Sequence, residues 1–221
     1  MPASDVYACL TGDLVASRLS EDREAVQLRL EEALSEANAS FGADLAVRLS
    51  VTLGDEWQGL FHTPDVALEA DLLLRTRLYP VEVRAGVGAG RVSTPLRETT
   101  ARMDGECFHR SRQALEAAGR RRIPGAVLLT GEPLLDAGAN AVCGLLAALA
   151  AGWTEKQLRS TLAYRELGTE QAAAAALGVS QPTLHQSLDG ARGKEFVEGF
   201  ERLLEFVRLC ASGASKGEEA P

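Results

Sequence analysis

The sequence has few of the residues from which zinc centres and disulfide scaffolds are built. Its 221 residues include three histidines and four cysteines, and the cysteines are scattered without a C-x-x-C pair. This pattern argues against a zinc site. It predicts reduced, mostly buried thiols, as is usual for proteins of the cytosol.

Long apolar runs and an excess of positive charge are also missing. The most apolar segment, residues 141–153, is too short to cross a bilayer, and the N-terminus has no signal-peptide pattern. The formal net charge is −8, which argues against a protein that coats nucleic acid by bulk charge. We therefore expect a cytoplasmic protein with no membrane partner.

What is present is a pattern of short strands and amphipathic helices. The chain has four candidate strands near its N-terminal end, at residues 6–10, 45–53, 56–61 and 81–90. A helix with Ser20 as its N-cap separates the first two strands, and a helix opened by Thr63-Pro64 separates the last two. The order β-α-β-β-α-β predicts a ferredoxin-like domain within an α+β fold.

The second half of the chain is mainly helical. A third helix, a strand at 126–130 and an apolar helix at 132–151 follow, and no strand signal remains beyond about Gly152. We expect three parts: an α+β domain over residues 5–150, an all-α helix-turn-helix module with a terminal helix over 152–211, and a disordered tail over 212–221.

Two Gly-Asp pairs, in `LTGDLVAS` and `VTLGDEWQGL`, each follow a buried strand. In the ferredoxin-like topology, Asp13 and Asp55 would meet at one edge of the sheet. Two converging carboxylates repel unless a cation lies between them, so we expect Mg²⁺, with Mn²⁺ as the alternative ion. Gly12 and Gly54 are the candidate phosphate-binding glycines. The alternative for each aspartate is a turn residue that bonds its own backbone.

The third helix carries a basic run, `GECFHRSRQALEAA`. His109 and Arg112 are candidates to approach nucleotide phosphates held near the aspartates, because a guanidinium fork suits phosphate. The alternatives are a solvated basic face and a hydrogen-bonded structural histidine.

Four segments, `TGDLVAS`, `TLGDEWQ`, `VRAGVGAGRV` and `GECFHRSRQALEAA`, resemble the signature regions of class III nucleotidyl cyclases, a palm-type fold shared in outline with GGDEF diguanylate cyclases. The stretch from about residue 5 to 190 resembles the SatD family more closely still. The resemblance implies that Asp13 and Asp55 are metal ligands and that a nucleoside triphosphate is the partner. It also shows departures: Val51 stands where those cyclases have an adenine-reading lysine, His109 replaces the substrate-binding asparagine, and Gln113 replaces the transition-state arginine.

Residues 168–188 have the sequence of a helix-turn-helix, with Gly178 in the turn and Ser180 as the next N-cap. The candidate DNA-contacting residues are Gln181, Thr183, His185 and Gln186. The alternative is a three-helix bundle without DNA contact, since residues 154–192 carry four basic and four acidic side chains. Dimerisation through the final helix would add a second half-site, so we expect a homodimer.

The leading hypothesis is therefore a SatD-like regulatory protein, in which a Mg²⁺-dependent nucleotide-binding palm domain is coupled to a helix-turn-helix. One alternative is an active nucleotidyl cyclase or transferase. The other is a DNA-binding transcriptional regulator whose palm domain is structural.

Overall fold

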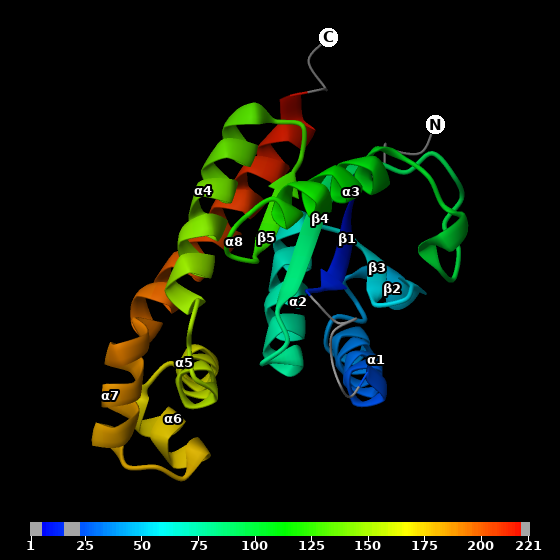
Figure 1. Cartoon of the computed structure of the whole chain (residues 1–221). Coiled ribbons are helices and arrows are strands. Elements are labelled where there is room, and N and C mark those ends of the chain that lie inside the picture. Colours follow the sequence, from blue (N-terminus) through cyan, green and yellow to red (C-terminus); the bar gives the residue numbers. More distant parts are fainter. Residues whose placement is uncertain (1–5, 16–22, 218–221) are drawn as a thin grey trace.

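A five-stranded sheet with helices on both faces forms the first part of the molecule (Figure 1). The computed structural model describes residues 6–15 and 23–217. The elements in chain order are β1 Val6–Leu14, α1 Arg23–Ser40, β2 Leu45–Leu53, β3 Glu56–Phe61, α2 Pro64–Leu78, β4 Val83–Arg91, the 3₁₀ helix η2 Thr100–Arg102, α3 Glu106–Gly119, β5 Ala126–Leu129, α4 Pro133–Ala150, α5 Glu155–Leu167, α6 Glu170–Leu177, α7 Gln181–Ala191 and α8 Gly193–Gly217.

The strands lie in the order β2-β3-β1-β4-β5. β1 is antiparallel to both β3 and β4, and β2 and β3 form a hairpin, so the predicted ferredoxin-like βαββαβ order is present. β5 extends the sheet by pairing parallel to β4, and α3 is the crossover between these two strands. The fold is mixed α+β.

Alternation along β1 divides the core into two layers. Ala8, Leu10 and Leu14 pack with apolar residues of α1 and α2 in the main cluster. Cys9 points to the other face, where it packs with Phe108 of α3. The sheet is therefore covered by α1 and α2 on one side and by α3 on the other.

β1 is longer than the sequence analysis predicted. The strand was expected to end at residue 10 and turn through Thr-Gly-Asp, but it continues to Leu14. Gly12 pairs with Trp57 on one side and with Ala85 on the other, and the Thr11 side chain is buried, so these residues belong to the sheet. The predicted cap Ser20 lies outside the described residues.

The hairpin between β2 and β3 agrees with its prediction. Leu53 pairs with Glu56, which leaves Gly54 and Asp55 as a two-residue turn. Gly54 has a φ of 62°, a conformation that glycine adopts without steric cost.

α3 lies unusually close to β4. A Cβ atom added at Gly86 would stand 2.3 Å from the carbonyl oxygen of Ser111, and one at Gly88 would stand 2.1 Å from the amide nitrogen of Ser111. Only residues without a side chain allow this approach. The two glycines therefore set the position of α3 over the sheet.

The C-terminal helices begin and end at good capping residues. Thr154 forms a capping box with Gln157 at the start of α5, and Ser180 caps α7. Gly178, which separates α6 from α7, has a left-handed φ of 65°. The helix boundaries match the predicted pattern, while a helix-turn-helix in the DNA-binding sense stays a prediction.

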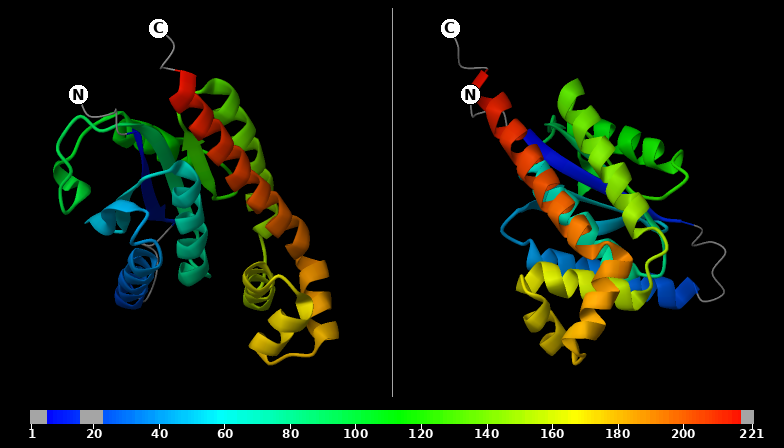
Figure 2. Two further views of the ribbon diagram at one scale, coloured as in Figure 1. Left: turned by 180° about the vertical axis from the view of Figure 1, so that it is seen from behind. Right: turned by 90° about the vertical axis from the view of Figure 1, so that its left-hand side faces the viewer.

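α8 returns along the first part of the molecule and packs beside α4 and against α2 (Figure 2). Trp153, Phe196 and Phe200 belong to the same apolar cluster as the residues under the sheet. One core therefore runs across the predicted boundary near residue 151. The segment assigned to a tail is helical as far as Gly217, and residues 218–221 lie outside the described part.

Within the described ranges, α4 is the one helix that is long and apolar enough to cross a membrane by length and composition. Core helices pass the same test, and α4 packs against β5 and α8. Leu134 and Leu145 are exposed on this helix.

The α3–β4 contact generates a prediction about stability. Replacing Gly88→Ala should force α3 away from the sheet and lower the free energy of unfolding by about 1–3 kcal/mol, the usual cost of overpacking. Gly144→Ala, in α4, is the matched control: its Cβ would meet nothing within 4 Å, so helix propensity should make it neutral or stabilising by up to about 1 kcal/mol. Urea unfolding measures both, and equal stability of the two variants would contradict the proposed contact.

Candidate functional site

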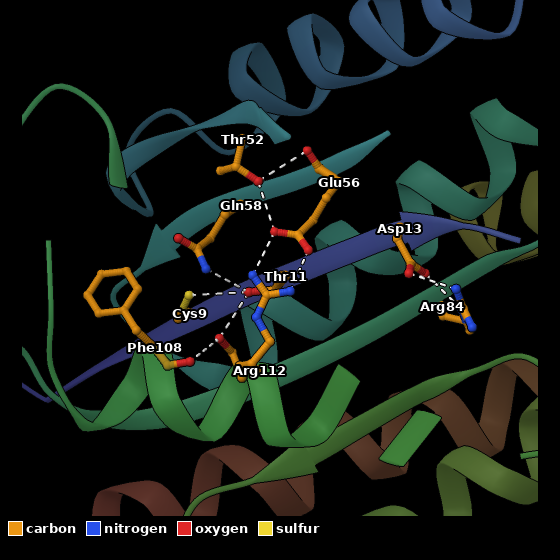
Figure 3. Close-up of polar contacts among 10 residues, drawn as sticks. Cys9, Thr11, Asp13, Thr52, Glu56, Gln58, Arg84, Phe108 and Arg112 are labelled. Atoms are coloured by element: carbon orange, nitrogen blue, oxygen red, sulfur yellow. Dashed lines mark hydrogen bonds and ion pairs between the residues drawn. The ribbon is translucent and has the colours of Figure 1, made fainter. Parts of the chain in front are cut away.

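Polar side chains from four strands and one helix gather between the sheet and α3 (Figure 3). We call this group the polar strip and define it by Thr11 and Asp13 of β1, Thr52 of β2, Glu56 and Gln58 of β3, Arg84 of β4, and Ser111 and Arg112 of α3. The period of two along a strand places alternate residues on this face.

Glu56 and Arg112 form one end of the polar strip. The two guanidinium nitrogens of Arg112 bond the two carboxylate oxygens of Glu56, at 2.8 Å for Nη2 and Oε1. Thr52 Oγ1 donates a further hydrogen bond to Oε1 at 3.0 Å. The Glu56 side chain is 19% exposed and that of Arg112 is 49% exposed, and the hydrogen bonds that Arg112 donates to Glu56 raise the pKa of Arg112. The arginine can therefore be reached from solvent.

The centre of the polar strip is a buried network of neutral groups. Thr11 Oγ1 lies 2.9 Å from Ser111 Oγ and accepts a hydrogen bond of 2.9 Å from Gln58 Nε2. Ser111 Oγ in turn donates to the Phe108 carbonyl oxygen at 3.0 Å. Burial raises the pKa of the neighbouring Cys9 thiol to about 11, so this thiol stays protonated at neutral pH.

Asp13 and Arg84 form the other end. They are opposite each other in the β1–β4 ladder, and Arg84 Nε and Nη2 bond Oδ1 and Oδ2 of Asp13 at 2.8 and 2.7 Å. Both side chains are partly exposed, 23% for Asp13 and 32% for Arg84. In Figure 3 this pair points away from the Glu56–Arg112 pair along β1.

The strand register places Asp13 and the β2–β3 turn that contains Asp55 at the same end of the sheet. The β1–β3 pairing ends at Gly12 and Trp57, so Asp13 continues beside Glu56, and Asp55 lies in the adjoining hairpin turn. No group of three or more His, Cys, Asp and Glu side chains gathers at metal-binding distance within residues 6–15 and 23–217. Carboxylates in ones and twos suit Mg²⁺, which takes its other ligands from phosphates and water. The assignment of Asp13 and Asp55 as metal ligands stays a prediction.

The other candidate phosphate-binding residues occupy different surroundings. Gly12 lies inside β1, and a Cβ there would stand 2.4 Å from the Trp57 ring, so this glycine makes room for the indole. Gly54 lies in the exposed hairpin turn. His109 is 69% exposed, and its Nε2 lies 3.0 Å from Asp104 Oδ1 in the loop before α3. Arg112 is the candidate whose side chain the structure brings into the polar strip.

The four candidate DNA-contacting residues lie on α7. Gln181, His185 and Gln186 are exposed, whereas Thr183 is half-buried. The Thr183 hydroxyl lies 2.8 Å from that of the cap residue Ser180, and His185 Nδ1 lies 3.1 Å from Glu170 Oε1. Contact with DNA stays a prediction.

Glu56, Arg84 and Ser111 were not among the site residues predicted from the sequence. Glu56 directly follows Asp55, and Arg84 occupies an alternate position of a strand rich in glycine. A polar residue at a strand position that should face a helix is a usable signal. Which partner it meets depends on the register between strands, which the sequence does not reveal.

The buried hydroxyls generate a second prediction. In a double-mutant cycle, Thr11→Val and Ser111→Ala should each lower the free energy of unfolding. The loss in the double variant should be about 1 kcal/mol smaller than the sum of the two single losses, because the hydroxyls share one hydrogen bond. Thermal and urea unfolding of the four proteins measure this coupling. Strictly additive losses would contradict a shared bond.

Known proteins were compared with this chain. A search of curated proteins gave no match. Among solved structures, a bacterial light-regulated adenylyl cyclase is 16% identical, with 56% of this chain and 73% of that chain covered and a TM-score of 0.40. The adenylyl cyclase CyaB from P. aeruginosa is 14% identical, with 51% and 71% covered and a TM-score of 0.39.

A regulator of polyketide synthase expression from Bifidobacterium adolescentis is 16% identical, with 90% of this chain and 85% of that chain covered and a TM-score of 0.26. We draw no functional conclusion from likenesses at these TM-scores. The model of the SatD family, in contrast, matches residues 7–189, most of the described chain. The protein therefore belongs to the SatD family.

Proposed function

We propose that the polar strip binds the phosphates of a nucleotide together with Mg²⁺, and that the protein is a nucleotide-responsive regulator. The observation that carries this proposal is the presence of two arginine–carboxylate pairs, Arg84–Asp13 and Arg112–Glu56, on one face of the sheet. Each pair holds a phosphate-binding cation and a metal-binding anion in contact.

An exchange of partners would convert these pairs into a binding site. Guanidinium groups bind phosphate oxygens with the same two-pronged geometry that they use for carboxylates. On nucleotide binding, Arg84 and Arg112 would turn to the phosphates, which would free the carboxylates of Asp13 and Glu56. In the absence of nucleotide, each arginine neutralises the partly buried carboxylate beside it.

The released carboxylates of Asp13 and Glu56 are the residues that would hold Mg²⁺, with Asp55 in the adjoining turn as the predicted alternative to Glu56. A bound Mg²⁺ ion would supply positive charge that offsets the charge of the phosphates. The chain itself contributes the orientation: Thr52 fixes the Glu56 carboxylate, and the β1–β4 ladder fixes Asp13.

The sequence resemblance adds support from an independent direction. The segments that resemble cyclase signature regions lie on β1, on the β2–β3 hairpin, on β4 and on α3. These are the elements that supply the polar strip. Segments spread over about a hundred residues of sequence therefore converge on one face of the sheet.

Binding is better supported than catalysis. The hydroxyls of Thr11 and Ser111 are buried and bonded to each other, and the Cys9 thiol is protonated, so none of these three groups is poised to form a covalent intermediate. Val51 and Gln113, which replace the base-reading lysine and the arginine of cyclases, are both exposed. A regulator has to bind the nucleotide but does not have to convert it.

The C-terminal helices are the proposed output of the nucleotide site. Arg165 of α5 bonds Glu69 of α2 and Glu201 of α8, each at 2.7 Å. A movement of α2 would therefore displace α5 and α8 through Arg165. The proposed output has two parts: DNA binding by α7 and homodimer formation through α8.

Calorimetric titration with the four nucleoside triphosphates tests the proposal. With Mg²⁺ present, the full chain should bind at least one of them, and Arg112→Gln should weaken binding about 10- to 100-fold because a charge-assisted hydrogen bond is lost. Asp13→Asn should weaken binding with Mg²⁺ present but much less in EDTA, where no cation needs its carboxylate.

Arg77→Gln is the matched control. Arg77 forms an exposed ion pair with Glu36 between α2 and α1, on the other side of the sheet, so this variant should bind like the wild type. Absence of heat with all four nucleotides, or equal weakening by Arg77→Gln and Arg112→Gln, would overturn the proposal. Formation of a cyclic or linked product in the same mixtures would replace regulation with catalysis.

A further inference from the structure

Helix α4 exposes an apolar face along its whole length. Its exposed positions after the first residue recur at spacings of three and four, which puts them on one side of the helix, and we call them the apolar stripe: Leu134, Ala137, Ala141, Leu145 and Ala148. Leu134 is 86% exposed and Leu145 is 67% exposed. No exposed position of α4, all of which lies in the described part, carries a charged or hydrogen-bonding side chain.

The polar side chains of α4 bond the rest of the protein instead. Asp136 accepts hydrogen bonds from the amide nitrogen and the hydroxyl of Thr130, both at 2.7 Å. Asn140 bonds the backbone of Leu128 in β5 through both ends of its amide. A surface helix normally has its polar residues on the outer face. The outer face of α4 therefore suits contact with another apolar surface.

The apolar stripe is complementary to a second copy of itself in an antiparallel pair. Ala141 is its middle residue. A two-fold axis at Ala141 places Leu134 opposite the partner's Ala148, and it places Leu145 opposite the partner's Ala137. Each large side chain then meets a small one, as close packing between helices requires. A parallel pair would set leucine against leucine and alanine against alanine, which would leave gaps.

Electrostatics favour a second copy over a charged partner or a membrane. A charged surface laid on the apolar stripe would lose hydration without gaining a partner. Helices that lie in a membrane surface carry Lys and Arg on their polar face, and α4 has neither. An antiparallel pair also sets the positive end of each helix dipole beside the negative end of the other.

α8 enlarges the face that a second copy would cover. The 18 residues of α4 form a helix about 27 Å long and roughly 10 Å wide, so α4 alone offers about 270 Å² per subunit. α8 lies beside it (Figure 2), where a Cβ atom at Gly138 would stand 3.3 Å from the Phe206 ring, and Phe206 and Leu209 are exposed. The two-fold axis keeps α8 on the same flank of both α4 helices. Four helices would thus bury about 1,000–1,200 Å² in total, at the low end of specific interfaces, where association is reversible.

We propose that this protein forms a two-fold homodimer in which the apolar stripes of two α4 helices pack antiparallel, with α8 of each subunit beside them. α4, rather than α8 alone, is then the centre of the homodimer that the proposed function includes. The dimer forms without nucleotide, because the polar strip takes no part in the contact.

Sedimentation velocity of the full chain without nucleotide measures the association. The 23.5 kDa chain should double in mass with rising concentration, with a Kd on the order of 10 µM. Ala141→Glu should raise that Kd at least about tenfold, because two carboxylates would meet at the axis. Ala39, which is exposed on α1, supplies the matched control, and Ala39→Glu should dimerise like the wild type.

Engineered cysteines test the orientation of the pair. Cys210 is first replaced by serine, because it is partly exposed, unlike the other cysteines. Ala141→Cys should then form an intermolecular disulfide on mild oxidation, since the two copies of position 141 face each other. Ala148→Cys should not, because the two copies of position 148 lie about 20 Å apart in an antiparallel pair.

Three results would reject the dimer: a monomer up to about 200 µM, well above the expected Kd, equal association of Ala141→Glu and the wild type, or a disulfide at position 148 as readily as at 141. Flotation of the monomeric wild type with phosphatidylcholine vesicles would also reject it and assign the apolar stripe to a membrane. The first result needs no variant, so a folding defect cannot explain it. Failure of nucleotide binding at the polar strip would leave the dimer unchanged, so the two proposals fail separately.

Discussion

α3 packs onto β4 with backbone against backbone at Gly86 and Gly88. The polar strip and the crossover from β4 to β5 take their positions from that contact. The short distance lets Ser111 reach across β4 to Thr11 of β1, and it lets Arg112 reach Glu56 of β3. A larger residue at either glycine would lift the helix and separate these partners. The same contact orients the crossover that leads from β4 to β5, so the sheet and the polar strip share one geometric cause.

The face of β1 under α3 changes character along the strand. Cys9 and Thr11 are fully buried, whereas Asp13, two residues further on, is partly exposed. Polar groups in the buried part are neutral and satisfy one another, and charged groups occur only where the strand reaches solvent. This is the distribution that desolvation favours, because an ion costs far more to bury than a hydroxyl. It also leaves the two arginine–carboxylate pairs within reach of a ligand.

β4 separates two sites of opposite chemistry. On one face Arg84 belongs to a charged, partly open site, and on the other the neighbouring Val83 belongs to the lining of an apolar, half-open pocket formed by α2, α4 and α8. α8 packs there because its apolar residues join the core under the sheet, whereas α6 and α7 pack mainly in a small cluster of their own. The two sites therefore adjoin through consecutive residues of one strand.

Local patterns in the sequence determined the βαββαβ order, the Gly54–Asp55 hairpin and the boundary between α6 and α7 at Gly178 and Ser180, because alternation, helical spacing and caps act between residues a few positions apart. They also pointed to Asp13 and Arg112. The partners of those two residues, Arg84 and Glu56, were decided only by tertiary structure. So were the extension of β1 through Gly12 and the packing of α8 against α2 and α4. The physical reason is that each depends on which strands pair, in which register, and how closely α3 approaches them, and these long-range choices leave no periodic trace in the chain.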